Sequence, residues 1–382
     1  SLLMVLWGAL ADKGIISGSG DEDKDVANFE KNVLGIQPYS VVINGKSYTY
    51  DWAQPLAGQA AMVADFVKDI KAGKGLKDAS FQNIGTVGNA ILNALQMGGN
   101  TLYEQSFLSG FKTLFGYDGF TKGLVSLAMD APTQFSPSFM RQLTQLYDDT
   151  YRQSFEYKDE LGSTKNQLMA GLPIFSKQLA PQVDTLGREM KRVDNGIFNV
   201  FLNPANVKEQ DTTKVGKEIY AVYQQTGEKA VLPSVAPYYV GTGEDKTSLT
   251  SHQRADWQKI SGQKVENCIE QLMVKPSYKN LKKDEKAELL TDISQYAKDY
   301  ANYKVVGDPI NKNWKKAYEA EQKGIDLADY LMIWRYKDGN GNGGVTQEEM
   351  EKAINKYGKN LTKKQKAYLW QQQNTSWKEK NN

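Results

Sequence analysis

The sequence contains only one cysteine and one histidine in 382 residues. A single thiol, Cys268, excludes an intramolecular disulfide framework, and we expect it to be an unreactive residue buried on a helix. A single imidazole, His252, excludes zinc sites that need two histidines. It also disfavours a catalytic triad, so we expect His252 to lie on an exposed helix face.

An excess of charge of one sign is also lacking, because 47 basic and 45 acidic residues leave a net charge of +2. The composition therefore predicts no strong electrostatic attraction to nucleic acid or to an anionic membrane. The sequence has no His-Glu-x-x-His, Cys-x-x-Cys or Gly-x-Ser-x-Gly motif, and 241–247 lacks the spacing of a phosphate-binding loop. We interpret Asp148 and Asp149 as helix-surface charges. The sequence predicts a protein that is not an enzyme and has no small-molecule substrate.

Long apolar runs are scarce as well. The apolar or small residues 1–11 are too few to span a bilayer, and we expect them to be the cut end of a longer segment, which would make this chain a fragment. Residues 79–103 carry no charge over 25 positions, but Asn and Gln are scattered through them. We therefore expect a buried or oligomer-facing helix there, with a membrane-spanning helix as the alternative.

Three regions differ in what they do contain. Residues 1–130 are rich in Gly and Ala, with helical periodicity and one hairpin signal. Residues 131–247 hold seven of the eleven prolines but keep many apolar residues, which predicts an ordered extended arm with short helices that lies across another surface. Residues 248–382 are helical in pattern. Helices are predicted over 251–273, 284–303, 311–322, 326–336 and 363–373.

The hairpin signal is a pair of turn residues, Asn44-Gly45, between two stretches of β-forming residues. This dipeptide is typical of a two-residue type I′ turn. Counting back from the turn pairs Val41 with Tyr48 and Tyr39 with Tyr50, which places apolar side chains on one face. The predicted fold is therefore mainly α, elongated and multi-helical, with one small β-hairpin at about 39–50.

Residues 338–349 have the ligand spacing of a twelve-residue EF-hand calcium loop. Gly343 stands at the sixth position, where the backbone turns sharply, and helical patterns flank the loop on both sides. The candidate calcium ligands are Asp338, Asn340, Asn342, Gly344 through its carbonyl, Thr346 and Glu349.

Only two of these ligands are carboxylates, and no second loop is present to pair with this one. Fewer carboxylates weaken calcium binding, so we expect an affinity of roughly 10⁻⁴–10⁻³ M. The alternative interpretation is a helix–loop–helix that keeps this shape without metal. A calcium-dependent module of the dockerin type is a further alternative, although it requires two tandem loops.

Several phrases, in order along the chain, resemble the C-terminal region of siphophage-type tail tape-measure proteins, which is also seen in large polyvalent phage and mobile-element proteins. They cover nearly all of the 382 residues. They include DKDVANFEK (23–31), YDWAQP (50–55), LPIFSKQLAP (172–181), FLNPANV (201–207) and LTKKQKAYLW (361–370).

The resemblance implies a structural protein of the phage tail whose length sets the tail length and whose C-terminal part lies at the distal tail tip. It implies contact with the distal tail protein, the tail hub and the tail tube proteins, and self-association in the tail lumen. During infection such proteins move to the host cell envelope and assist DNA delivery, with contacts to host membrane and phage DNA. The expected apolar anchors for partners are Trp52, Phe175, Leu179 and Phe201.

A second interpretation keeps the phage context but changes the assembly. The chain would then be a module of a large multidomain protein, or of an internal phage protein that is ejected and crosses the host envelope. A long coiled-coil segment before Ser1 would favour the tape measure over this alternative.

Overall fold

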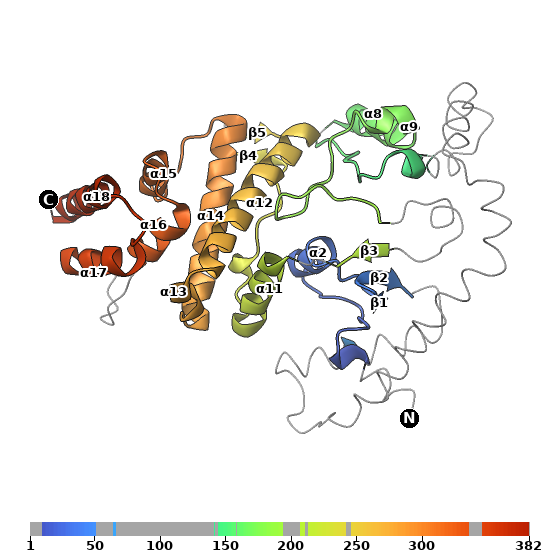
Figure 1. The fold of residues 1–382 in the computed structure, drawn as a ribbon. Coiled ribbons are helices and arrows are strands. Elements are labelled where there is room, and N and C mark those ends of the chain that lie inside the picture. The colour runs from blue at the N-terminus through green and yellow to red at the C-terminus, as the bar shows by residue number, and fades with distance from the viewer. Residues whose placement is uncertain are drawn as a thin grey trace. The chain divides into compact units, whose positions relative to one another are not determined.

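The computed structural model describes residues 10–50, 64–65, 141, 144–157, 159–193, 207–210, 213–241, 246–335 and 346–381 (Figure 1). In these ranges the chain is mainly helical, as the sequence predicts, and it holds a three-stranded and a two-stranded antiparallel sheet where one hairpin was predicted. The predicted helix over 79–103 and the apolar start of the chain, residues 1–9, lie outside the described ranges.

The chain folds as two compact units, each built from separate stretches of sequence. The first unit comprises Ser1–Asp184, Glu189–Thr212 and Ser248–Ala255, and the second comprises Thr185–Arg188, Thr213–Thr247 and Asp256–Asn382. The division of the sequence into three regions by composition stays a prediction.

The first unit combines short helices with a three-stranded antiparallel sheet in the order β1-β2-β3. Helix α2 begins after Asp23, whose carboxylate accepts hydrogen bonds from the backbone N–H groups of Asp25 and Val26. It buries Val26 and Phe29. The elements are α2 (Lys24–Asn32), β1 (Ser40–Ile43), β2 (Lys46–Thr49), α8 (Glu160–Ala170), α9 (Pro173–Ser176) and β3 (Val207–Glu209).

The predicted hairpin is present in the predicted register. Val41 lies opposite Tyr48, and the N–H of Tyr50 donates to the carbonyl of Tyr39 at 2.6 Å. Both turn residues have positive φ, 51° at Asn44 and 74° at Gly45, as a type I′ turn requires. Strand β3, far away in sequence, pairs with β2 as a third strand.

The more deeply buried face of this hairpin is polar rather than apolar. Ser40 and Ser47 are almost fully buried, whereas the side chains of Val41 and Tyr48 are half-buried. The Ser47 hydroxyl donates to Ser40 Oγ, the Ser40 hydroxyl donates to the carbonyl of Gln37, and Gln37 Nε2 donates to the carbonyl of Ser47, at 2.7, 2.7 and 2.8 Å. Because every member of this ring has a partner, these polar groups can be buried without a large desolvation penalty.

Pro173 is one of the prolines that predict extended backbone within 131–247, but the chain is helical where it stands. Pro173 begins the short helix α9. Proline is well suited to the first helical position, because its fixed φ is helical and its missing N–H would have no partner there. The chain is irregular after α9, where Leu179 and Ala180 are buried.

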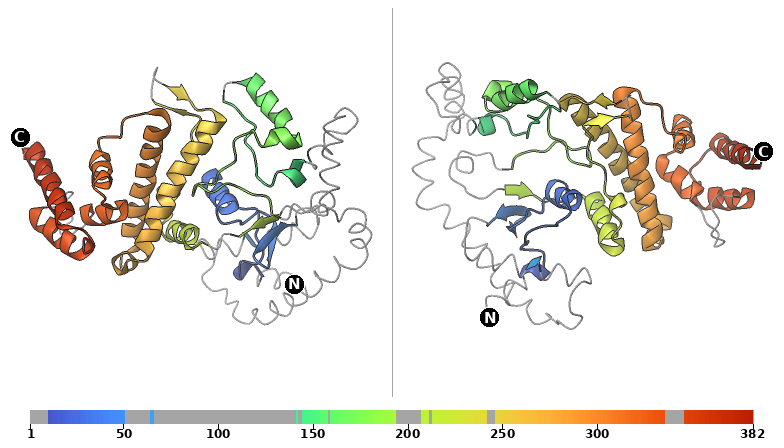
Figure 2. Two further views of the ribbon diagram at one scale, coloured as in Figure 1. Left: turned by 45° about the horizontal axis from the view of Figure 1, so that its top comes forward. Right: turned by 180° about the vertical axis from the view of Figure 1, so that it is seen from behind.

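The remaining elements are mostly helices, and α12 and α14 run side by side (Figures 1 and 2). The indole Nε1 of Trp257 in α12 donates to Asn302 Oδ1 in α14 at 2.7 Å. These elements are α11 (Lys214–Thr226), η2 (Lys229–Val231), β4 (Tyr239–Val240), β5 (Thr247–Ser248), α12 (Ser251–Met273), α13 (Pro276–Lys279), α14 (Lys283–Val306), α15 (Lys315–Gln322), α16 (Leu327–Trp334), α17 (Gln347–Tyr357) and α18 (Lys363–Asn381).

The helices predicted after residue 248 are confirmed, with differences at their ends. The range 251–273 is α12 as predicted, whereas α14 and α18 extend further than predicted and α15 begins later. Pro276, three residues beyond the end of α12, begins α13. As expected, Cys268 is buried and His252 is exposed.

A close backbone contact joins the turn at Leu186-Gly187 to the middle of α12. Gly187 has a φ of +82°, and Leu186 is fully buried. A Cβ added to Gly262 would lie 2.0 Å from the backbone N of Gly187 and 2.3 Å from the carbonyl carbon of Leu186. Only a residue without a side chain fits at position 262 while this turn keeps its place.

We expect Gly262→Ala to destabilise the protein by about 1–3 kcal/mol, because the added methyl group overlaps backbone that cannot move aside cheaply. At an ordinary helix position the same change would stabilise by about 1 kcal/mol. Urea unfolding of the full chain measures the difference. Glu270→Ala, at an exposed position of the same helix, is the control and should change the free energy of unfolding by less than about 0.5 kcal/mol. A stabilised Gly262→Ala variant would contradict the contact.

Candidate functional site

The described residues include part of each site predicted from the sequence. Trp52 and Phe201 lie outside them, as do four of the candidate calcium ligands, Asp338, Asn340, Asn342 and Gly344. Two predicted partner anchors, Phe175 and Leu179, are described, and so are two candidate ligands, Thr346 and Glu349.

The helices that flank the candidate calcium loop are α16 and α17, as predicted. Thr346 is the N-cap of α17. Its hydroxyl oxygen accepts from the N–H of Glu349 at 3.2 Å, and Glu349 Oε2 accepts from the N–H of Thr346 at 2.7 Å. This reciprocal capping box fixes the first turn of the exit helix. A bidentate calcium ligand uses both carboxylate oxygens, so Glu349 would hold the ion with the same carboxylate that caps α17.

Among the residues that the structure describes, no group of three or more His, Cys, Asp or Glu side chains is arranged to hold a metal ion. Residues 338–345, which carry most of the candidate ligands, are not among them. The weak calcium site stays a prediction.

Helix α8 and the adjoining α9 carry exposed apolar side chains, although helices normally bury such residues. None of the residues of α8 is buried, and Leu161 and Leu168, two turns apart, are 85% and 68% exposed. In α9, Ile174 is 49% and Phe175 is 39% exposed. We call these four side chains the α8–α9 surface. Isolated helices as short as α8 are marginal in water, so their stability comes from packing of an apolar face.

The two described partner anchors occupy different environments. Phe175 belongs to the α8–α9 surface, whereas Leu179, four residues later, is only 4% exposed. Leu179 therefore packs within its own unit, and Phe175 is the one of the two that another molecule can reach. Whether either residue contacts a partner stays a prediction.

A buried carboxylate lies beside α9. Asp148 was interpreted as a helix-surface charge, and this is wrong: it follows a helix and is 2% exposed. Arg152 donates to both of its oxygens, each at 2.9 Å, and the Ser176 hydroxyl donates to Oδ2 at 2.8 Å. No sequence signal distinguished Asp148 from Asp149, which is half exposed and pairs with Lys191 at 3.4 Å.

The backbone around this carboxylate is held by a second arginine. Arg192 Nη1 donates to the carbonyls of Asp148 and Thr150 at 2.7 and 2.8 Å, and its guanidinium lies 4.6 Å from the centre of the Tyr151 ring. Burial opposes ionisation of Asp148, but hydrogen bonds from Arg152, Ser176 and the Thr150 N–H together outweigh it and lower the pKa of Asp148. A fully paired carboxylate is a poor proton acceptor, so this cluster is structural.

In the second unit a buried glutamine holds an extended, proline-containing segment. Gln258 of α12 is 3% exposed. Its Oε1 accepts from the N–H of Ala236 at 2.7 Å, and its Nε2 donates to the carbonyl of Ser234 at 3.1 Å. The side-chain amide thus forms the pair of hydrogen bonds that a neighbouring strand would form. This segment buries Ala236 and leaves Val235 and Tyr238 exposed.

No protein-family model, curated protein or solved structure matches this chain. In the described ranges no helix is both long enough and apolar enough to cross a membrane. The sequence resemblance to tape-measure proteins therefore stays a prediction.

We expect Asp148→Asn to destabilise the protein by about 2–4 kcal/mol at neutral pH, because it leaves Arg152 without its counter-charge. The lowered pKa of Asp148 stabilises the native state above the unfolded value of about 3.9, and this contribution is lost as the pH falls through the folded value. The variant should therefore show a flatter acid limb when the free energy of unfolding is measured against pH.

The matched control for this prediction is Asp149→Asn, since Asp149 is 49% exposed. It should change the free energy of unfolding by less than about 0.5 kcal/mol at every pH. Equal effects of the two substitutions would contradict a special role for Asp148.

Calcium titration of the full chain should release or absorb heat with a dissociation constant of roughly 10⁻⁴–10⁻³ M. Glu349→Gln should abolish this heat, because an amide cannot act as a bidentate anionic ligand. The amide oxygen can still accept from the Thr346 N–H, so α17 should stay capped. Glu348→Gln, an exposed neighbour outside the ligand set, should bind like the parent. If no heat is measured at millimolar calcium, or if the heat is unchanged in Glu349→Gln, residues 338–349 do not bind calcium.

Proposed function

We propose that this chain is the C-terminal part of a phage tail tape-measure protein and acts at the distal tail tip in tail assembly, length determination and DNA delivery. It is a structural protein in this proposal and carries no enzymatic activity. Its partners are the distal tail protein, the tail hub and the tail tube proteins. The ordered series of sequence phrases that resemble tape-measure proteins supports this assignment.

The observation that carries the proposal is the α8–α9 surface. Leu161 and Leu168 are 85% and 68% exposed in a helix with no buried residue. Burying apolar side chains of this size would be favourable, so their exposure in the free chain is unfavourable. Exposed apolar patches on soluble proteins commonly mark contact sites for other proteins. In a tail-tip protein, partner proteins would cover these apolar side chains in the assembled particle.

The segment around Ser234 and Ala236 is a second observation that supports the proposed function. A segment fixed to α12 by Gln258 keeps an ordered backbone while Val235 and Tyr238 face outward. Ordered extended chain offers side chains to a partner with little further loss of conformational entropy. This suits a protein that lies against several neighbours in a narrow assembly.

The test is complementation of a phage that lacks its own copy of the gene. Leu168→Glu should leave folding unchanged, because the side chain is 68% exposed in the free chain, yet it should sharply reduce the yield of finished tails. Loss of an apolar interface anchor costs about 2–4 kcal/mol, and a buried unpaired charge adds to that cost.

The control for this experiment is Val274→Glu, which also places a carboxylate at an exposed apolar position, 75% exposed, outside the α8–α9 surface. It should support normal tail assembly. Normal tails with Leu168→Glu would contradict the role of the α8–α9 surface, and absence of the chain from purified particles would contradict the proposed function itself.

A further inference from the structure

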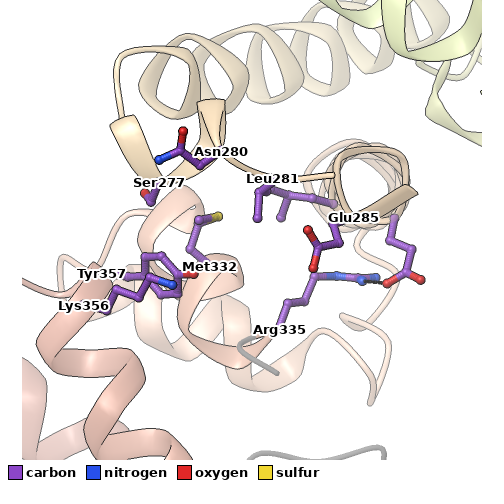
Figure 3. A pocket seen from close by; sticks show the side chains of 10 residues that line it. Ser277, Asn280, Leu281, Glu285, Met332, Arg335, Lys356 and Tyr357 are labelled. Atoms are coloured by element: carbon purple, nitrogen blue, oxygen red, sulfur yellow. Dashed lines mark hydrogen bonds and ion pairs between the residues drawn. The ribbon is translucent and has the colours of Figure 1, made fainter. Parts of the chain in front are cut away.

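A cavity of about 240 Å³ lies in the second unit, between α13, α14, α16 and α17 (Figure 3). Sites for drug-sized ligands and cofactors usually measure roughly 300–1,000 Å³. This cavity is therefore suited to a group the size of one amino-acid side chain. It is separate from the α8–α9 surface, which belongs to the first unit.

The cavity has an apolar side and a polar rim. Leu289 and Met332 are almost fully buried beneath it, and Leu281 is half-buried beside them. Ser277 and Asn280, from the α13 turn, add hydrogen-bonding side chains to the lining (Figure 3). An elongated ligand with an apolar stem and polar ends matches this lining.

Four charged residues line the cavity, and Arg335 pairs with one of the others, Glu288. Arg335 donates to Asp292 through Nε and to Glu288 Oε2 through Nη1, the latter at 2.7 Å. Its guanidinium is therefore already paired with two carboxylates and has little to offer an anionic ligand. Lys356 supplies the other cation of the lining.

Glu285 is the carboxylate that remains available. It forms no ion pair with the residues that the structure describes, and Figure 3 shows its carboxylate between Leu281 and Arg335. One of its oxygens, Oε2, accepts from the N–H of Lys282 at 2.8 Å, which holds the side chain in place at the start of α14. The other oxygen can accept from a ligand.

We propose that this cavity binds a lysine side chain of a partner protein. The ammonium group contacts Glu285, the methylene stem lies on Leu281 and Met332, and the partner's peptide groups reach Ser277 and Asn280. Arginine fits less well, because its forked guanidinium is best matched by both oxygens of a carboxylate, and Oε2 of Glu285 is already engaged. The inference does not depend on the proposed role in the phage tail.

The test uses the full chain with ¹³C-labelled methionine methyl groups, with the Met332 signal assigned from Met332→Leu. The probe is lysine blocked at both ends, Nα-acetyl-lysine methylamide. We expect a saturable shift of the Met332 methyl signal with a millimolar dissociation constant, because one side chain buries little area and its ion pair is solvent-accessible. Butylamine, Nα-acetyl-arginine methylamide and the Nε-acetylated lysine probe should each bind more weakly.

Two variants separate binding in the cavity from a general effect. Glu285→Gln keeps an oxygen for the Lys282 N–H and should weaken binding of the probe by about 1.5- to 5-fold, the range for an exposed ion pair. Ser277→Trp should fill the cavity and abolish the shift while Glu285 remains. Glu351→Gln, an exposed carboxylate of α17 outside the lining, should bind like the parent.

The proposal is overturned if the Met332 methyl signal does not move, if the Nε-acetylated probe binds as tightly as the charged one, or if Glu285→Gln leaves the affinity unchanged. If butylamine binds as tightly as the blocked lysine probe, Ser277 and Asn280 do not contact the peptide groups of the ligand. Equal or tighter binding of the arginine probe would contradict the preference for lysine.

Discussion

Peptide groups that are buried outside helices and sheets need hydrogen-bond partners, because water cannot reach them. In this chain side chains supply many of these partners. Gln258 holds the backbone at Ser234 and Ala236, and Arg192 holds the carbonyls of Asp148 and Thr150. These polar contacts allow irregular segments to lie in fixed positions on a helical protein.

The same arrangement bears on the proposed role in a phage tail. Where side chains satisfy the backbone, an irregular segment can be ordered without joining a sheet, and its remaining side chains can face outward. Such a contact holds the end of α9, where the Ser176 hydroxyl donates to the buried Asp148 carboxylate. A preformed surface of this kind costs less entropy on binding than a disordered one.

Local features of the fold could be predicted because their causes are close together in sequence. Asn44-Gly45 fixes a turn by its own backbone preferences, and the turn then fixes the register of Val41 and Tyr48. The buried cluster around Asp148 could not be predicted in this way. Asp148 looks like its neighbour Asp149 until Arg152 and Ser176 are brought to it, and the latter lies 28 positions away.

The sequence by itself determined the helical class, the hairpin and its register, and the two helices on either side of 338–349, since periodicity, turn residues and caps act over a few positions. Only the tertiary structure decided that Ser40 and Ser47 face inward, that residue 262 must be glycine and that Glu285 borders a cavity. Each of these depends on atoms from distant parts of the chain, and their approach is set by packing and hydrogen bonding across the whole unit.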